Sequence, residues 1–183
     1  MKITNTKFQD VKLIYFNSFS DSRGSFSEVF RKDLLEENTF SKINFVQENL
    51  SLSNKHVLRG LHFQEKHPQG KYLQTLNYLI QDVIVDLRKE SSTFGFWESF
   101  HLDSNMAIWI PPGFAHGFLT FEDNTKVLYR CTDYYYPKDQ KSINWNDEYL
   151  NIYWDNFVPI VSEKDSSGIS FKEYYENMIQ IQT

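Results

Sequence analysis

Arg59 and His62 lie three residues apart in VLRGLHFQ, residues 57–64, a run that otherwise has the composition of a half-buried strand. An imidazole titrates at about pH 6.5 and can accept a proton at neutral pH, whereas a guanidinium can hold an anion. Regular alternation would put the two side chains on opposite faces of the strand. Because a strand glycine often marks a bulge, we expect a distortion at Gly60 that brings both to one site. The alternative is a structural histidine and a surface arginine.

Three further side chains could act together with a histidine that accepts a proton and an arginine that binds an anion. Lys71 follows a glycine-containing turn in QGKY, where its ammonium could neutralise an oxyanion. Tyr129 begins YRCTDYYYP, and a phenol with a pKa of about 10 keeps its proton at neutral pH, so it could act as an acid opposite a histidine. Asp165 ends the polar segment SEKD. Each also has an ordinary structural explanation, as an exposed lysine, a packed tyrosine, and a turn or capping aspartate.

The segment WIPPGFAHGF, residues 109–118, raises the question of a metal site. Its P-x-G-x-x-H pattern, ending at His116, resembles the second motif of the cupin superfamily, in which that histidine binds a metal. The first cupin motif should supply an H-x-H pair, but Gly60 and Gln64 stand two residues either side of His62. Metal catalysis usually needs three convergent protein ligands, and no other histidine has ligand spacing to His62. We therefore predict no metal and no other cofactor.

The pattern of short apolar segments between turn-like clusters, such as NSFSDSRGS at 17–25, predicts an all-β antiparallel sandwich or barrel. In DVIVDL, Val83 and Val85 should face the packed wall, whereas Asp82 and Asp86 should face a cavity or solvent. Short helices are expected at Arg31–Glu37 and in the tail of about 170–183, at Ser170–Ile181. The expected strands are Lys12–Phe16, Phe26–Phe30, Asn44–Leu50, Val57–Phe63, Tyr72–Asn77, Gln81–Asp86, Trp97–Leu102, Ala107–Ile110, Gly117–Phe121 and Val127–Thr132.

Composition narrows the class of protein. The 183 residues, 40% hydrophobic and 17% aromatic, suit one globular domain over 1–183 with a sizeable core. A net charge of −5 without a long basic block argues against general nucleic-acid binding. Cys131 is the only cysteine, so no intrachain disulfide is possible. The sequence has no signal-peptide core and no apolar run long enough for a membrane span, so we expect a cytoplasmic protein.

The order of these motifs resembles the dTDP-4-dehydrorhamnose 3,5-epimerase family, the RmlC-type nucleotide-sugar epimerases, from about Lys12 to Asp165. The segments that carry the resemblance are DSRGSFSE, FVQENLSLS, VLRGLHFQ, QGKY, DVIVDLR, SSTFG, WIPPGFAHGF, YRCTDYYYP, INWNDEYLNIYW and PIVSEKD. It implies a cupin-type jelly roll without metal, usually a homodimer. The implied activity is cofactor-independent epimerisation at C3, C5 or both of a dTDP-4-keto-6-deoxyhexose, in deoxysugar and surface polysaccharide biosynthesis.

The resemblance also implies roles for individual residues. His62 matches the catalytic base, Asp165 its carboxylate partner, and Tyr129 the proton donor on the opposite face. Lys71 matches the lysine near the sugar carbonyl oxygen, and Arg59 a binder of the diphosphate. A second His–Asp pair and other pocket-lining positions correspond to His116, Asp82, Tyr135, Gln47 and Asn49. A segment that reaches into the partner subunit's site, and touches the nucleotide there, corresponds to Arg23, Phe26 and Glu28.

Two departures from the family pattern leave the substrate open. The family commonly has G-E-V-F where this chain has Tyr78-Leu79-Ile80-Gln81, and often an arginine where this chain has Gln74. The alternatives are a C3-only or C5-only epimerase acting on another nucleotide-linked 4-keto sugar, or a nucleotide-sugar ketoisomerase. From other classes, a metal-dependent cupin oxygenase and a non-catalytic sugar-binding module also stay open.

Overall fold

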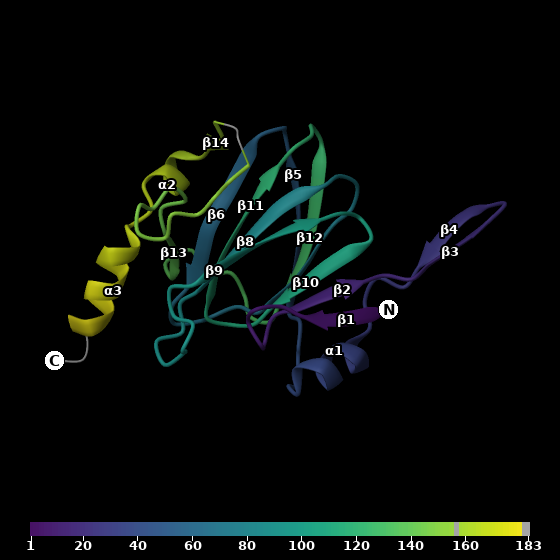
Figure 1. Cartoon of the computed structure of the whole chain (residues 1–183), viewed down its shortest axis with the longest axis horizontal. Coiled ribbons are helices and arrows are strands. Elements are labelled where there is room, and N and C mark those ends of the chain that lie inside the picture. Colours follow the sequence, from purple (N-terminus) through teal and green to yellow (C-terminus); the bar gives the residue numbers. More distant parts are fainter. Residues whose placement is uncertain (156–157, 181–183) are drawn as a thin grey trace.

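The computed structural model describes residues 1–155 and 158–180, and within them the chain forms two antiparallel sheets of six strands each (Figure 1). The first sheet has the order β1 (Lys2–Asn5), β2 (Lys12–Tyr15), β10 (Met106–Ile110), β7 (Lys71–Thr75), β12 (Thr125–Cys131) and β5 (Gln47–Ser53). The second has the order β13 (Gln140–Ser142), β6 (Val57–Gln64), β11 (Phe114–Thr120), β8 (Ile80–Asp86) and β9 (Trp97–Leu102), and β14 (Ile160–Val161) pairs in parallel with β6. The all-β architecture agrees with the prediction.

The core between the sheets follows from period-2 alternation. Leu73 on β7 and Ile108 on β10 point inward and are fully buried against Ile84 and Phe100 of the second sheet. Phe8 closes one end of this layer, with its ring 5.3 Å from that of Phe114 in an edge-to-face arrangement. Apolar packing therefore fills one end of the sandwich, and the polar cavity lies elsewhere between the sheets.

Helices and loops cover the outer faces. On the second sheet, Val83 and Val85 pack against the C-terminal segment and α3 (Phe171–Gln180), as the alternation in DVIVDL predicted. On the first sheet, α1 (Lys32–Thr39) buries Leu35 in a cluster with Ile14 and Trp109. Both helices occur where they were expected, although residues 181–183 of the predicted tail lie outside the described residues. No helix in the described ranges is long and apolar enough to cross a membrane.

The serine-rich segment predicted as a turn is instead a hairpin of β3 (Ser18–Asp21) and β4 (Gly24–Ser27), which projects away from the two sheets (Figure 1). The cross-strand pair Phe19 and Phe26 is 66% and 72% exposed, so the hairpin makes little contact with its own chain. The predicted strand Phe26–Phe30 ends at Ser27, because the Tyr72 hydroxyl donates to the Val29 carbonyl and draws the chain back to the first sheet.

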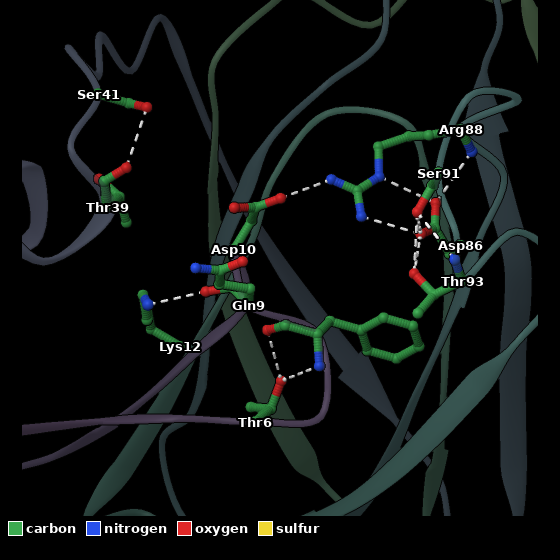
Figure 2. A network of polar contacts seen from close by, with 11 residues as sticks. Thr6, Gln9, Asp10, Lys12, Thr39, Ser41, Asp86, Arg88, Ser91 and Thr93 are labelled. Carbon is green, nitrogen blue, oxygen red and sulfur yellow. Dashed lines mark hydrogen bonds and ion pairs between the residues drawn. The ribbon is translucent and has the colours of Figure 1, made fainter.

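Asp82 and Asp86 were expected to face a cavity or solvent, but both are fully buried. Asp86 instead holds a loop through its hydrogen bonds. The Asp86 carboxylate accepts hydrogen bonds from Arg88 Nε at 2.9 Å, Ser91 Oγ at 2.7 Å and Thr93 Oγ1 at 2.7 Å (Figure 2). Burial opposes ionisation of Asp86, but these hydrogen bonds outweigh it and lower its pKa. Asp86 therefore anchors the loop after β8, and Arg88 extends the network to Asp10 at 2.7 Å.

Asp86→Asn should reduce the free energy of unfolding by about 3–5 kcal/mol, because it leaves the Arg88 charge without its buried partner. Asp10→Asn is the matched control, since Asp10 pairs with the same guanidinium from an exposed position. It should cost at most about 1 kcal/mol. Urea denaturation measures both, and equal losses would contradict the assignment of Asp86 as the anchor.

Candidate active site

A one-residue bulge in β6 brings the first two candidate residues together. His116 on β11 pairs with His62, but Phe118 pairs with Arg59, so β6 uses one residue more than β11 over this interval. Gly60 has φ +129°, a conformation that residues with side chains rarely adopt. A Cβ at this position would lie 2.5 Å from Gly117 Cα, because the two backbones approach closely. The expected distortion at Gly60 is confirmed, and Arg59 and His62 line the same cavity.

This cavity, of about 320 Å³, is lined by side chains from both sheets. The predicted residues that line it are Arg59, His62, Lys71, His116, Tyr129, Tyr135, Gln47 and Asn49. Asp82 and Asp165 lie behind His116 and His62 and do not line the cavity. Asp82 was expected to line it, so the structure corrects that prediction. Arg23 and Phe26 lie on the projecting hairpin and Glu28 directly after it, outside the cavity of their own chain.

Asp165 holds His62, with Oδ1 2.5 Å from the ring nitrogen Nε2. The parallel pairing of β14 with β6 brings the C-terminal segment to this point, and the one-turn helix α2 (Glu163–Ser166) follows directly. Ser162 caps that helix by accepting a hydrogen bond from the Asp165 amide, and the Gly60 amide donates to the second carboxylate oxygen at 3.4 Å. Burial opposes ionisation of Asp165, but the hydrogen bonds from His62 and Gly60 outweigh it and lower the pKa. Asp165 therefore orients the imidazole as an ionised carboxylate.

A second, deeper pair joins His116 on β11 to Asp82 on the adjacent strand β8. The His116 Nε2 lies 2.7 Å from Asp82 Oδ2, and both side chains are buried. Burial lowers the pKa of His116. At neutral pH, His116 is therefore an uncharged ring that donates to Asp82 and presents its other edge toward the cavity.

The opposite wall consists of inward-facing side chains of the first sheet. Lys71 on β7 is the direct cross-strand partner of Cys131 on β12, and Tyr129 is the partner of Asn49 on β5. Burial raises the pKa of Tyr129, so the phenol keeps its proton at neutral pH. Burial lowers the pKa of Lys71. Cys131 accepts a hydrogen bond from Asn49 Nδ2 at 3.7 Å and does not line the cavity.

The arrangement places a proton acceptor and a proton donor on facing sheets. His62 belongs to the second sheet and Tyr129 to the first, and the cavity lies between them. The Arg59 guanidinium is tethered at its edge by the Ser53 hydroxyl, 3.0 Å from Nε. A molecule in the cavity could therefore lose a proton on one side and gain one on the other. Across residues 1–155 and 158–180, no group of three or more His, Cys, Asp or Glu side chains is arranged to hold a metal ion.

Several cavity residues were not predicted from the sequence, and Gln64 is the most informative of them. Its Oε1 accepts from the Tyr136 amide at 2.7 Å and its Nε2 donates to the Tyr134 carbonyl at 3.1 Å, so it holds the loop that carries Tyr135. Period-2 spacing from His62 was the available signal. The other missed residues are Ser51, Phe63, Gln69, Phe118 and Gln140.

Comparisons with known proteins identify the family of this chain. The sequence model of the dTDP-4-dehydrorhamnose 3,5-epimerase family matches residues 5–173. The enzyme of that name from Neisseria gonorrhoeae is 43% identical over 92% of this chain, which spans 52% of that relative's length. The Salmonella typhimurium enzyme of the same name is 42% identical, over 92% of this chain and 94% of its own length. The crystal structure of Legionella pneumophila dTDP-6-deoxy-D-glucose-3,5-epimerase, in complex with dTDP-4-keto-L-rhamnose, is 38% identical, with a TM-score of 0.89 over 93% of both chains. The predicted family and its cupin-type jelly roll are confirmed.

Gly60→Ala should destabilise the fold more than Gly24→Ala. The two glycines have nearly the same φ, +129° and +128°, but a Cβ at Gly24 has no atom within 4 Å. Gly24→Ala therefore reports conformational strain alone, about 1–3 kcal/mol, whereas Gly60→Ala adds a clash with the β11 backbone. Urea denaturation compares the two variants, and a Gly60→Ala protein as stable as Gly24→Ala would contradict the close approach of the two strands.

Proposed function

Because this chain belongs to the dTDP-4-dehydrorhamnose 3,5-epimerase family, we propose that it is the isomerase that converts dTDP-4-dehydro-6-deoxyglucose to dTDP-4-dehydrorhamnose by inverting C3 and C5. The observation that carries the proposal is the pairing of His62 with Asp165 at 2.5 Å, across the cavity from Tyr129. An epimerase must remove a proton from one face of the sugar and return one to the other face. Two proton-transfer groups on facing walls match that requirement.

The 4-keto group of the substrate explains the rest of the chemistry. A carbonyl at C4 acidifies the C–H bonds at C3 and C5, and His62, oriented by Asp165, removes one of these protons. The resulting enolate oxygen needs a positive neighbour, and Lys71 supplies it; such a donor contributes about 3 kcal/mol. Tyr129 then protonates the carbon from the opposite face. Substrate and product have the same oxidation state, so the proposal needs no redox cofactor.

Arg59 acts on a part of the substrate that does not react. Its guanidinium suits a diphosphate, and its place at the cavity edge leaves the interior to the sugar. The pocket-lining residues Gln47, Asn49 and Tyr135 are linked to one another, since Gln47 Nε2 donates to Asn49 Oδ1 and the Tyr135 amide donates to Gln47 Oε1, each at 2.9 Å. We assign them to contacts with the sugar.

The projecting hairpin supports a second part of the proposal, in which two copies of the chain complete each other's sites. Phe26 is 72% exposed and the Arg23 side chain 87% exposed, although Arg23 pairs with Asp21. Together with Glu28, they are assigned to the nucleotide in the partner subunit's cavity. The homodimer and the place in surface polysaccharide synthesis stay predictions from the family, and the cytoplasmic location stays a prediction from the sequence.

Incubation of the protein with dTDP-4-keto-6-deoxyglucose in D₂O tests the function directly. We expect deuterium at both C3 and C5 of the product, with the carbonyl still at C4, in the NMR spectrum. Deuterium at one carbon alone would identify a mono-epimerase, and a carbonyl at C3 would identify a ketoisomerase. The absence of any exchange would overturn the proposal in favour of a sugar-binding module.

Arg59→Ala and His62→Ala should affect different kinetic parameters, KM in the first variant and kcat in the second. Loss of Arg59 removes binding energy from the diphosphate and should mainly raise KM. Loss of His62 removes the base and should lower kcat about 10²–10⁴-fold. Steady-state assays with each variant measure the split, and an effect of both substitutions on KM alone would contradict the roles.

Tyr129→Phe should separate exchange from inversion. Without the phenol, His62 can still remove and return a proton on its own face, so deuterium enters the sugar while net inversion slows. NMR of the sugar in D₂O follows both events in one sample. Loss of exchange together with inversion would show that Tyr129 is needed before the proton is removed.

A further inference from the structure

Lys71 is a cation without a direct partner in the described part of the chain. Its Nζ donates no hydrogen bond to any of the described residues, although its side chain faces the cavity from β7. Burial disfavours the ammonium form and lowers the pKa of Lys71, while the neighbouring Cys131 and Asp82 raise it. In the proposed function the ammonium must persist, because a neutral amine would stabilise an enolate poorly. Something near Lys71 therefore has to offset its burial.

Asp82 has the complementary property, since one of its buried carboxylate oxygens has no hydrogen-bond partner among the described residues. The side chain is fully buried on β8 of the facing sheet, and its Oδ2 lies 2.7 Å from His116 Nε2. Its Oδ1 makes no hydrogen bond within the described part of the chain. A carboxylate buried in this way needs a positive charge nearby.

His116 and Cys131 carry no charge at neutral pH, so the positive charge of Lys71 and the negative charge of Asp82 offset each other. Burial lowers the pKa of His116, so that ring donates a hydrogen bond to Asp82 but adds no positive charge at neutral pH. Burial raises the pKa of the Cys131 thiol, so the cross-strand neighbour of Lys71 is uncharged there too. The titratable groups that line the cavity with Lys71 are Arg59, His62, His116, Tyr129 and Tyr135. Asp82, Asp165 and Cys131 lie behind them.

We infer that Asp82 is a positioning residue whose negative charge keeps Lys71 protonated beneath the sugar, and that His116 holds Asp82 at the required depth. The inference rests on the proposed function for the purpose of that charge. A counter-charge behind His116 has an advantage over a direct salt bridge. It stabilises the ammonium while leaving the N–H donors of Lys71 free to point at the C4 oxygen. Asp82 itself does not line the cavity and does not touch the substrate.

Asp82→Asn tests the inference, because the amide keeps the shape and an oxygen that can accept from His116 but removes the charge. The ¹³Cε signal of Lys71 in lysine-labelled protein, assigned by its loss in Lys71→Arg, reports the titration of Lys71 without substrate. We expect its midpoint to fall by about one pH unit or more in Asp82→Asn. The alkaline limb of the kcat profile should move to lower pH in parallel, so that activity is lost first at high pH.

Two control variants isolate the charge of Asp82. Asp155→Asn removes a carboxylate that pairs with His101 at 2.9 Å on the surface, and should change neither the Lys71 titration nor the pH profile. Cys131→Ser removes the thiol, which is uncharged at neutral pH, and should lower the Lys71 midpoint less than Asp82→Asn does. An unchanged midpoint in folded Asp82→Asn, or a fall as large in Cys131→Ser, would overturn the inference. Failure of the proposed function would appear separately, as wild-type protein that exchanges no substrate proton.

Discussion

The close approach of β6 and β11 at Gly60 and Gly117 is the constraint on which the site depends. A Cβ on Gly117 would lie 2.8 Å from the Arg59 carbonyl oxygen, so neither strand can carry a side chain at the contact. The extra residue in β6 turns Arg59 toward the face that already holds His62. The amide of Gly60 also donates a hydrogen bond to the Asp165 carboxylate. One backbone distortion therefore positions Arg59, His62 and Asp165, the three residues to which we assign anion binding, proton removal and orientation of the imidazole.

The site uses two His–Asp pairs of similar geometry in different surroundings. His62 is partly exposed, with 28% of its side chain accessible, and can exchange protons with a molecule in the cavity. His116 is almost completely buried, and its environment disfavours the charged ring. The two imidazoles therefore differ in their surroundings, which suits His62 to the proposed proton transfer and His116 to holding a carboxylate. Tyr129 and Lys71 face both pairs from the other sheet. Burial raises the pKa of Tyr129 and lowers the pKa of Lys71.

Sequence reasoning predicted the features that follow from local pattern. The bounds of Trp97–Leu102 follow from an apolar segment between turn-like clusters. The outward packing of Val83 and Val85 follows from period-2 alternation, and the distortion in β6 from one glycine in a strand. Alternation gives the face of a side chain but not its depth along the sandwich, so Asp86 was expected near a cavity and instead anchors a loop. The helical turn that carries Asp165 depends on long-range pairing of β14 with β6, which no local pattern encodes. The hairpin β3–β4 has a serine-rich composition that is typical of turns.

The central claim is that His62 and Tyr129 act on opposite faces of one sugar ring. A crystal structure of the protein with a bound dTDP-linked 4-keto sugar tests it most directly. We predict the ring between the imidazole and the phenol, with the C4 oxygen toward Lys71 and the diphosphate at Arg59. A sugar ring that presents the same face to both side chains, or that binds outside the cavity they line, would contradict the account.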